Sequence, residues 1–298
     1  VAALLVFVLA GGVVLVTGQH IFLAVVLGAM SVGLLLAALK DLGEAKTDFG
    51  QIVLLTGSIG EFYTIILLTA ADIAIVHGVG STFVLEFGKL LAIFVIAWVL
   101  LVLLRTLVWW FPGAFARVVT THDASEIGVR AAFALMLSFV AVAALLGVKT
   151  ILGAFIAGAL FSFVFREKAA VETKLSSIGF GFFVPIFFID VDLGFDLHGV
   201  LAEGFLGNLA FLTVGSLIPK LLPMLLLLVV GLNLRRSLAA GVILAAPLTL
   251  LVAISKIGVE IAVIDVAMGD AIVAFAVISG IVYPVVFRMI LGRSAASG

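Results

Sequence analysis

The sequence predicts an all-α polytopic membrane protein with about ten transmembrane helices. Of its 298 residues, 65% are hydrophobic and only 11% are charged, and the mean hydropathy is +1.45. A soluble domain has about 45–50% apolar and about 25% charged residues, so a soluble enzyme is excluded. The net charge of −1 offers no basic face for nucleic acid, and the absence of cysteine excludes disulfides and thiolate metal sites.

A helix needs roughly 20 mostly apolar residues to cross a bilayer. Ten windows of this kind are separated by charges and turn residues. The chain enters the first window at Val1 without a charged leader region, so this window is interpreted as a span, and we expect the natural N-terminus to lie further upstream. The spans are expected near 1–17, 20–39, 50–76, 82–104, 126–147, 148–166, 178–194, 203–231, 235–257 and 264–292.

The basic residues predict the orientation of these spans. If the first residue is cytoplasmic, the outer stretches hold only Lys149 and Lys256. Most of the remaining lysines and arginines then fall in the inner stretches. An excess of basic residues is typical of the cytoplasmic side of membrane proteins, so both ends of the chain are predicted to be cytoplasmic. The basic residues of the inner stretches are Lys40, Lys46, Arg105, Arg117, Arg130, Arg166, Lys168, Lys174, Arg235, Arg236, Arg288 and Arg293.

Two charges of opposite sign fall near the middle of predicted spans, Glu61 in the third and Lys220 in the eighth. A charge at the bilayer centre costs about 2.5–3.5 kcal/mol, and such residues often mark ion or proton paths. One interpretation is a polar cavity in which a cation and protons compete for the Glu61 carboxylate. The alternatives are a structural ion pair and, for Gly60-Glu61, helix packing through small residues. We favour the ion site for Glu61, whereas both interpretations stay open for Lys220.

Asp72 follows Glu61 by eleven residues, which is three helical turns, and so lies on almost the same helix face. It could extend a proton path, although an interfacial aspartate at the outer end of the span is the preferred interpretation.

Two spans carry sequences that predict a broken helix. The second contains Gly28 and Gly33 around Ser31, and the ninth contains Pro247 and Thr249. A glycine pair or a mid-helix proline frees backbone groups, which lipid tolerates only where they are buried in protein or line a cavity. Because one break falls in the first three spans and one in the last three, the pattern also predicts an inverted repeat of two three-helix units.

Several of these segments resemble the Kef-type and Nap-type monovalent cation/proton antiporters. The similar segments are residues 31–34, 39–43, 46–51, 152–158 and 182–188, in the family's order. The resemblance covers nearly the whole chain, but two or three N-terminal helices of the family are missing. It implies a sodium/proton antiporter-like fold with two crossing broken helices, in a homodimer in the cell membrane of a bacterium or archaeon.

The resemblance also implies roles for particular residues. The family's cation and proton pair aligns with Gly60 and Glu61, so Glu61 is expected to bind the proton and, transiently, Na⁺ or K⁺. Lys220 aligns with the lysine of electrogenic members and is expected to supply the counter-charge, pairing with Glu61 or another group. Because Gly60 lacks the usual polar side chain, one-for-one exchange is favoured. Ser31, Pro247 and Thr249 align with the crossover.

The predicted function is exchange of protons for Na⁺ or K⁺ by alternating access. Residues 1–76 and 203–298 would form the two halves of the ion-translocating core, and 77–202 the linker and scaffold or dimerisation helices. A non-transporting membrane scaffold or sensor and an organic-anion symporter stay open as alternatives. No phosphate loop, zinc-protease motif or serine-hydrolase elbow occurs in the sequence, so neither an enzyme nor a cofactor is predicted.

Overall fold

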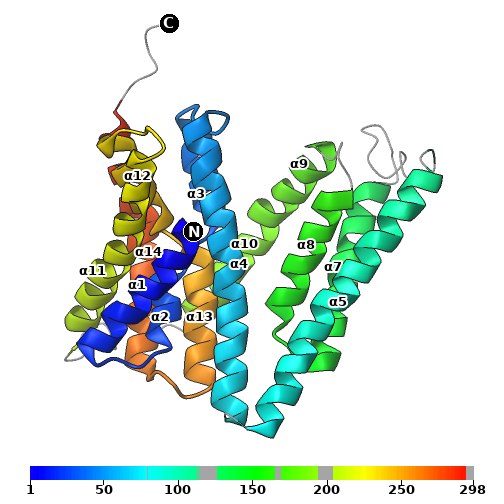
Figure 1. The fold of residues 1–298 in the computed structure, drawn as a ribbon, viewed down its shortest axis with the longest axis horizontal. Coiled ribbons are helices and arrows are strands. Elements are labelled where there is room, and N and C mark those ends of the chain that lie inside the picture. The colour runs from blue at the N-terminus through cyan, green and yellow to red at the C-terminus, as the bar shows by residue number, and fades with distance from the viewer. Residues whose placement is uncertain (79, 112, 114–125, 165–168, 194–203, 293–298) are drawn as a thin grey trace, which may run out of the picture. The chain divides into compact units, whose positions relative to one another are not determined.

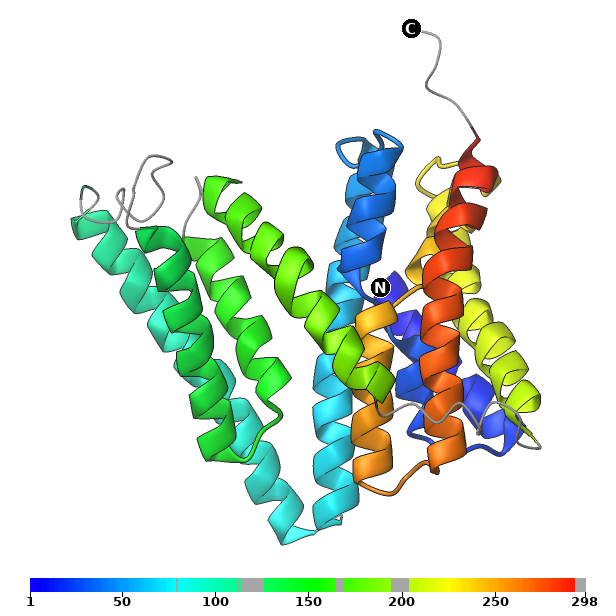
Figure 2. The same ribbon diagram turned by 180° about the vertical axis from the view of Figure 1, so that it is seen from behind.

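The computed structural model describes residues 1–78, 80–111, 113, 126–164, 169–193 and 204–292 (Figures 1 and 2). All regular secondary structure in these residues is helical, as the sequence predicts. The chain divides into two compact units. Unit 1 comprises residues 1–72 and 195–298, and unit 2 comprises residues 73–194.

Unit 1 is built around α11, which packs against α1, α2, α12 and α14. Pro219 and Pro223 lie inside α11, and the chain continues after it as the short 3₁₀ helix η3. The second half of the unit closes with α13 packed along α14. The elements are α1 (Ala2–Thr17), α2 (Leu23–Gly28), α3 (Val32–Asp41), α4 (Asp48–His77, up to Asp72 in this unit), α11 (Phe205–Met224), η3 (Leu225–Leu228), α12 (Leu234–Leu244), α13 (Leu248–Glu260) and α14 (Val266–Leu291).

Both predicted breaks are confirmed. The first break, residues 29–31, separates α2 from α3, and extended backbone at Ser31 (φ −143°, ψ 145°) interrupts the helical hydrogen bonds. The second break, residues 245–247, separates α12 from α13 with a bend of 42°. Pro247 stands directly before α13, where its missing N–H costs nothing, because the first helical N–H groups have no intrahelical acceptor.

The half-helices next to the two breaks approach each other. A Cβ built on Gly57 of α4 would lie 2.6 Å from Leu35 of α3 and 3.3 Å from Leu244 of α12. On the other side of the breaks, Gly258 of α13 faces Phe22, directly before α2. In Figures 1 and 2, α3 and α12 accordingly occupy one end of unit 1, and α2 and α13 the other.

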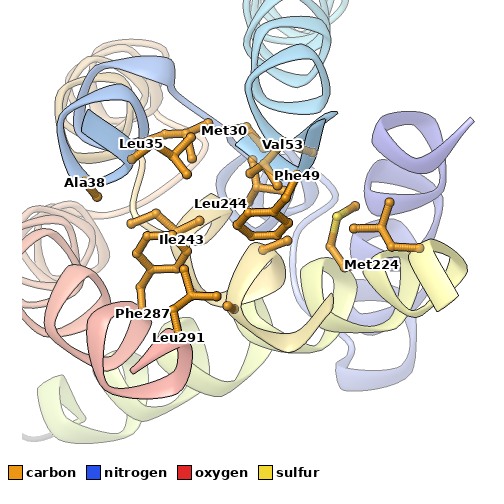
Figure 3. Close-up of a cluster of buried hydrophobic side chains, with 14 of the residues drawn as sticks. Met30, Leu35, Ala38, Phe49, Val53, Met224, Ile243, Leu244, Phe287 and Leu291 are labelled. Atoms are coloured by element: carbon orange, nitrogen blue, oxygen red, sulfur yellow. The ribbon is translucent and has the colours of Figure 1, made fainter. Parts of the chain in front are cut away.

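An apolar cluster fills the space between α3, α4, α12 and α14 (Figure 3). Met30 contributes from the first break itself, Phe49 from α4 and Phe287 from α14, and all three side chains are buried. Because these contacts join segments that are far apart in the sequence, they fix where the first break lies against its neighbours.

Ionic contacts join the ends of several helices in unit 1. Arg288 of α14 pairs with Asp41 of α3, and Arg236 of α12 lies 3.5 Å from Glu44. The Arg236 guanidinium also lies over the ring of Phe49, 5.6 Å from its centroid. Two of the basic residues predicted for the inner stretches, Arg236 and Arg288, thus contact acidic residues at the C-terminal end of α3 and in the turn after it.

Unit 2 is an assembly of apolar helices with a π-helical turn. Gly153 of α8 lets the backbone of α7 approach, because a Cβ there would meet the Phe139 carbonyl oxygen at 2.4 Å. Large apolar side chains of α5, such as Trp98 and Val102, are exposed, as is typical of a helix that faces lipid. The elements are α5 (Ser81–Trp110), α7 (Ile127–Leu146), α8 (Thr150–Val164), α9 (Ala169–Ile178), η1 (Gly179–Phe183) and α10 (Val184–Leu193).

In the described part of the chain, six helical segments are long and apolar enough to cross a membrane, with α2 and α3 counted as one segment (Leu23–Asp41). A seventh span is counted if the bent pair α12 and α13 is one span. The helices α1 and α8 are apolar but shorter. Each of the ten predicted windows overlaps a described helical segment. The structure thus supports a multi-pass helical protein, whereas the count of ten and the inverted repeat stay predictions.

Candidate functional site

Glu61 lies on α4 and points at the first break. The Ser31 hydroxyl donates to Glu61 Oε1 at 3.4 Å, and the Val32 backbone N–H donates to Oε2 at 3.3 Å. Both oxygens of one carboxylate thus meet consecutive residues of another segment. The sequence predicted Glu61 and Ser31 as separate features of two spans, and the structure brings them together.

The backbone of α3 favours a negative charge at this position. Val32 is the first residue of α3 and Ser31 is its N-cap. The first N–H groups of a helix have no intrahelical acceptor, and the helix dipole places partial positive charge there. The break turns this end of α3 toward α4, so a buried carboxylate finds donors without a basic side chain. Glu61 itself is half-buried.

Thr64 and Gly60 attach the first break to the same face of α4. The Met30 backbone N–H donates to Thr64 Oγ1 at 3.3 Å, and the Thr64 hydroxyl donates to the Gly60 carbonyl at 2.8 Å. A Cβ on Gly60 would lie only 2.3 Å from Met30 Sδ. The space beside Glu61, where the resemblance leads us to expect a second polar side chain, is therefore filled by the Met30 thioether.

Lys220 is fully buried in α11. Its Nζ has no hydrogen-bond partner among the residues that the structure describes. Its carbonyl oxygen faces α12, where a Cβ on Gly241 would lie 3.2 Å from it. The expected pairing with Glu61 is not among the ion pairs of the described residues, so the role of Lys220 as a counter-charge stays a prediction.

The remaining predicted site residues lie on other parts of unit 1. Asp72 is half-buried on α4, eleven residues after Glu61. Pro247 is buried in the second break, and Thr249 is half-buried as the second residue of α13. Among the described residues, the hydrogen bonds to the Glu61 carboxylate come from Ser31 and Val32, and neither Pro247 nor Thr249 takes part.

Met30 and Thr64 were missed by the sequence analysis. Methionine and threonine are ordinary residues of membrane helices, so neither type points to ion chemistry by itself. The spacing of Gly60, Glu61 and Thr64 could have indicated them, because residues four apart share a helix face. Their partner in the break, however, is 34 residues from Thr64 and not detectable by periodicity.

The family model described as "Sodium/hydrogen exchanger, transmembrane" matches residues 1–293. The chain belongs to this family. The chain is similar to the putative Na(+)/H(+) antiporter YjbQ of Bacillus subtilis, with 31% identity over 295 residues that cover 96% of the chain and 44% of the relative. It is also similar to the probable Na(+)/H(+) antiporter 3 of Methanocaldococcus jannaschii, with 26% identity over 277 residues, 90% of the chain and 67% of the relative.

A third similar protein is the Na(+)/H(+)-K(+) antiporter GerN of Bacillus cereus, which is 30% identical over 184 residues, 61% of the chain and 45% of the relative. The chain thus spans less than half the length of YjbQ and aligns with less than half of GerN. The match to this family confirms the predicted resemblance to monovalent cation/proton antiporters.

Proposed function

We propose that the exchanger carries out secondary antiport of protons for Na⁺ or K⁺, with Glu61 as the shared site. The observation that carries this proposal is the contact of both Glu61 oxygens with the first break. A carboxylate at membrane depth is costly, so such residues are rare and usually mark ion or proton paths. Here the hydrogen-bond donors to Glu61 among the described residues are neutral groups. The proton and the cation then compete for one carboxylate, so the site carries either a proton or a cation across the membrane in one step, but not both.

Alternating access would move the helices around the breaks and expose Glu61 to each side in turn. Ser31 supports this proposal, because its hydroxyl can donate to the empty carboxylate and can turn its oxygen toward a bound cation. Na⁺ and K⁺ both remain substrates of the proposal, since GerN is named for both ions and YjbQ for sodium. Lys220 would provide the counter-charge when Glu61 is ionised.

We propose electroneutral exchange of one proton for one cation. Gly60 has no side chain to bind a second ion, and Met30 occupies the adjacent space. One carboxylate can hold one monovalent charge. In proteoliposomes, the exchange rate should therefore be the same with and without an imposed membrane potential, and a rate that follows the potential would contradict this stoichiometry.

The experiment that tests the antiport uses the full gene product in everted vesicles of an antiporter-deficient bacterial strain. A ΔpH-sensitive dye is followed on addition of Na⁺, K⁺ or Li⁺. We expect dequenching with at least one of these ions and loss of the response in Glu61→Gln, which keeps the shape and removes the charge.

The matched control is Glu86→Gln. Glu86 lies on α5 of unit 2, in a local pair with Lys89 at 2.6 Å, so this substitution removes a carboxylate from an apolar helix that carries no part of either break. It should exchange at the normal rate. Normal exchange in Glu61→Gln would show that Glu61 is not the carrier, and an absence of any cation response in well-folded protein would refute the antiport.

We also propose a cell-membrane location with both ends of the chain in the cytoplasm. The ion pairs of Arg236 and Arg288 support it, because they gather basic residues at one end of unit 1. The chain contains no cysteine, so single cysteines can be labelled without background. Lys46→Cys should react only from the cytoplasmic side and Gln19→Cys only from the outer side. The homodimer implied by the resemblance stays a prediction, which native mass spectrometry can test.

A further inference from the structure

Thr64 is a buried threonine whose single hydroxyl serves two backbone groups. It accepts from the Met30 N–H at 3.3 Å and donates to the Gly60 carbonyl at 2.8 Å. Its side chain is fully buried. A threonine that bonds only to its own helix is common in membrane proteins, whereas this one also reaches a segment 34 residues earlier in the chain.

The Met30 N–H needs this partner because it lies in the first break. The break interrupts the helical ladder, so the N–H has no acceptor one turn earlier in α2. An unsatisfied amide costs several kcal/mol in the apolar interior of a membrane protein, and Met30 is fully buried. Thr64 therefore holds the backbone of the break at Met30.

The two donors to Glu61 follow directly in the chain. Met30 precedes Ser31, whose hydroxyl reaches Glu61 Oε1, and Val32, whose N–H reaches Oε2. Consecutive peptide units are joined by only two soft dihedral angles per residue. Fixing the Met30 amide thus limits where the Ser31 hydroxyl and the Val32 N–H can lie.

Gly60 supports the same attachment from the other side. Without a Cβ, it allows the Met30 side chain to lie directly against α4, where a methyl group would come within 2.3 Å of Sδ. Met30 is fully buried in this position. Backbone and side chain of one break residue are therefore held by two residues of α4 that lie one turn apart, with Glu61 between them.

We propose that Thr64 is a positioning residue of the ion site, which pre-organises Ser31 and Val32 around Glu61 and so sets the cation affinity of the exchanger. This inference rests on the proposed function. A site whose groups are already in place spends no binding energy on ordering them. Loss of the Thr64 hydroxyl would free the break and weaken cation binding, although Thr64 would not touch the ion.

The test compares Thr64→Val with Thr64→Ser in the full-length protein, with transport followed in everted vesicles. Valine keeps the shape and removes the hydroxyl, whereas serine keeps the hydroxyl. In Thr64→Val we expect the cation concentration for half-maximal exchange to rise about fivefold, the effect of one lost hydrogen bond. Thr64→Ser should restore the wild-type value.

Thr69→Val is the matched control. Thr69 is equally buried on α4, but its hydroxyl donates within the helix to the Ile65 carbonyl at 2.8 Å. It should leave the half-maximal concentration unchanged. A merely structural role of Thr64 would lower the amount of folded protein or the maximal rate without this shift. An unchanged or lowered half-maximal cation concentration in Thr64→Val would overturn the inference. The same holds if Thr64→Ser raises this concentration as much as Thr64→Val does.

Amide hydrogen exchange gives a second readout that does not depend on transport. In Thr64→Val, peptides covering residues 29–32 should exchange at least about tenfold faster, because local opening exposes the freed amides. Thr64→Ser and Thr69→Val should match the wild type. If the wild type showed no cation response, the proposed antiport would be refuted, whatever the hydrogen-exchange result for Thr64→Val. Unchanged hydrogen exchange in Thr64→Val would instead overturn the positioning role.

Discussion

The two breaks differ in how their freed backbone groups are satisfied. In the first, Met30 and Val32 donate to Thr64 and Glu61, which are side chains of another helix. In the second, Ala245 and Ala246 donate to carbonyls of α12 itself. The first break therefore depends on α4 for its structure, and the second is closed by local turns.

This difference teaches where ion chemistry can be expected. A break held by the side chain of an ionisable residue changes when that residue binds a proton or a cation. In the second break, Ala-Ala-Pro, the backbone N–H groups bond to carbonyls of α12, and no bond to an ionisable side chain is present among the described residues. The sequence symmetry of two broken spans thus does not extend to their polar contacts, and we expect the second break to act through packing.

Gly60 and Gly280 offer the largest contrast between the breaks. A methyl group on Gly60 would meet Met30 Cβ at 3.0 Å and Sδ at 2.3 Å, so the first break must move. On Gly280 it would meet Leu248, directly after the second break, and Leu34 of α3, each at an ordinary 3.4 Å. Overpacking predicts a loss of roughly 2–3 kcal/mol in the free energy of unfolding for Gly60→Ala, and a change within about 0.5 kcal/mol for Gly280→Ala.

Denaturant or thermal unfolding in detergent measures both variants. The double variant Met30→Ala with Gly60→Ala should be more stable than the sum of the single changes predicts, because the clash partner is gone. Equal stability of Gly60→Ala and Gly280→Ala would show that the two breaks tolerate packing changes alike.

Substitution of Lys220 tests whether a charge next to the second broken helix, α12 and α13, takes part in transport. It is buried on α11, which packs on α12, and its Nζ has no hydrogen-bond partner among the described residues. An unpaired buried charge opposes folding, so Lys220→Met should raise the free energy of unfolding by about 1–2 kcal/mol. If Lys220 is the counter-charge, the same variant should lose most of its exchange activity. Higher stability with full activity would mean that the lysine has no role in transport.

Ser31 and Thr249 test the hydroxyl groups near each break. Ser31 donates to Glu61, whereas Thr249 lies on α13 after the second break. We expect Ser31→Ala to raise the half-maximal cation concentration about fivefold to tenfold, and Thr249→Ala to change it less than about twofold. Transport titrations in vesicles distinguish the two. Similar effects of both substitutions would argue for a site shared equally between the breaks.

The ion pair of Arg236 with Glu44 has the smallest expected effect. It joins the start of α12 to the turn after α3, and both partners are partly exposed at 40% and 18%. Exposed pairs contribute about 0–1 kcal/mol and are screened by salt. Arg236→Gln should lower the free energy of unfolding by about 0.5 kcal/mol at low salt, and the difference should vanish in about 1 M salt. A larger, salt-independent loss would indicate that this contact holds the two half-helices together.

The sequence by itself determined the membrane class, the helical segments and both breaks. Long apolar windows require helices because backbone groups must be satisfied within lipid, and glycine and proline interrupt the helical ladder at fixed positions. It also singled out Glu61 as a candidate site residue, since a carboxylate within an apolar span is unusual enough to stand out against its neighbours.

Only the tertiary structure decided what surrounds that carboxylate. The contacts of Glu61 with Val32, and of Thr64 and Gly60 with Met30, join residues about thirty positions apart. Hydropathy and periodicity describe each helix alone and carry no information about which helix faces which. Whether Lys220 pairs with Glu61 likewise depends on the distance between α11 and α4. That distance is set by helix packing and is not encoded in the hydropathy of either helix.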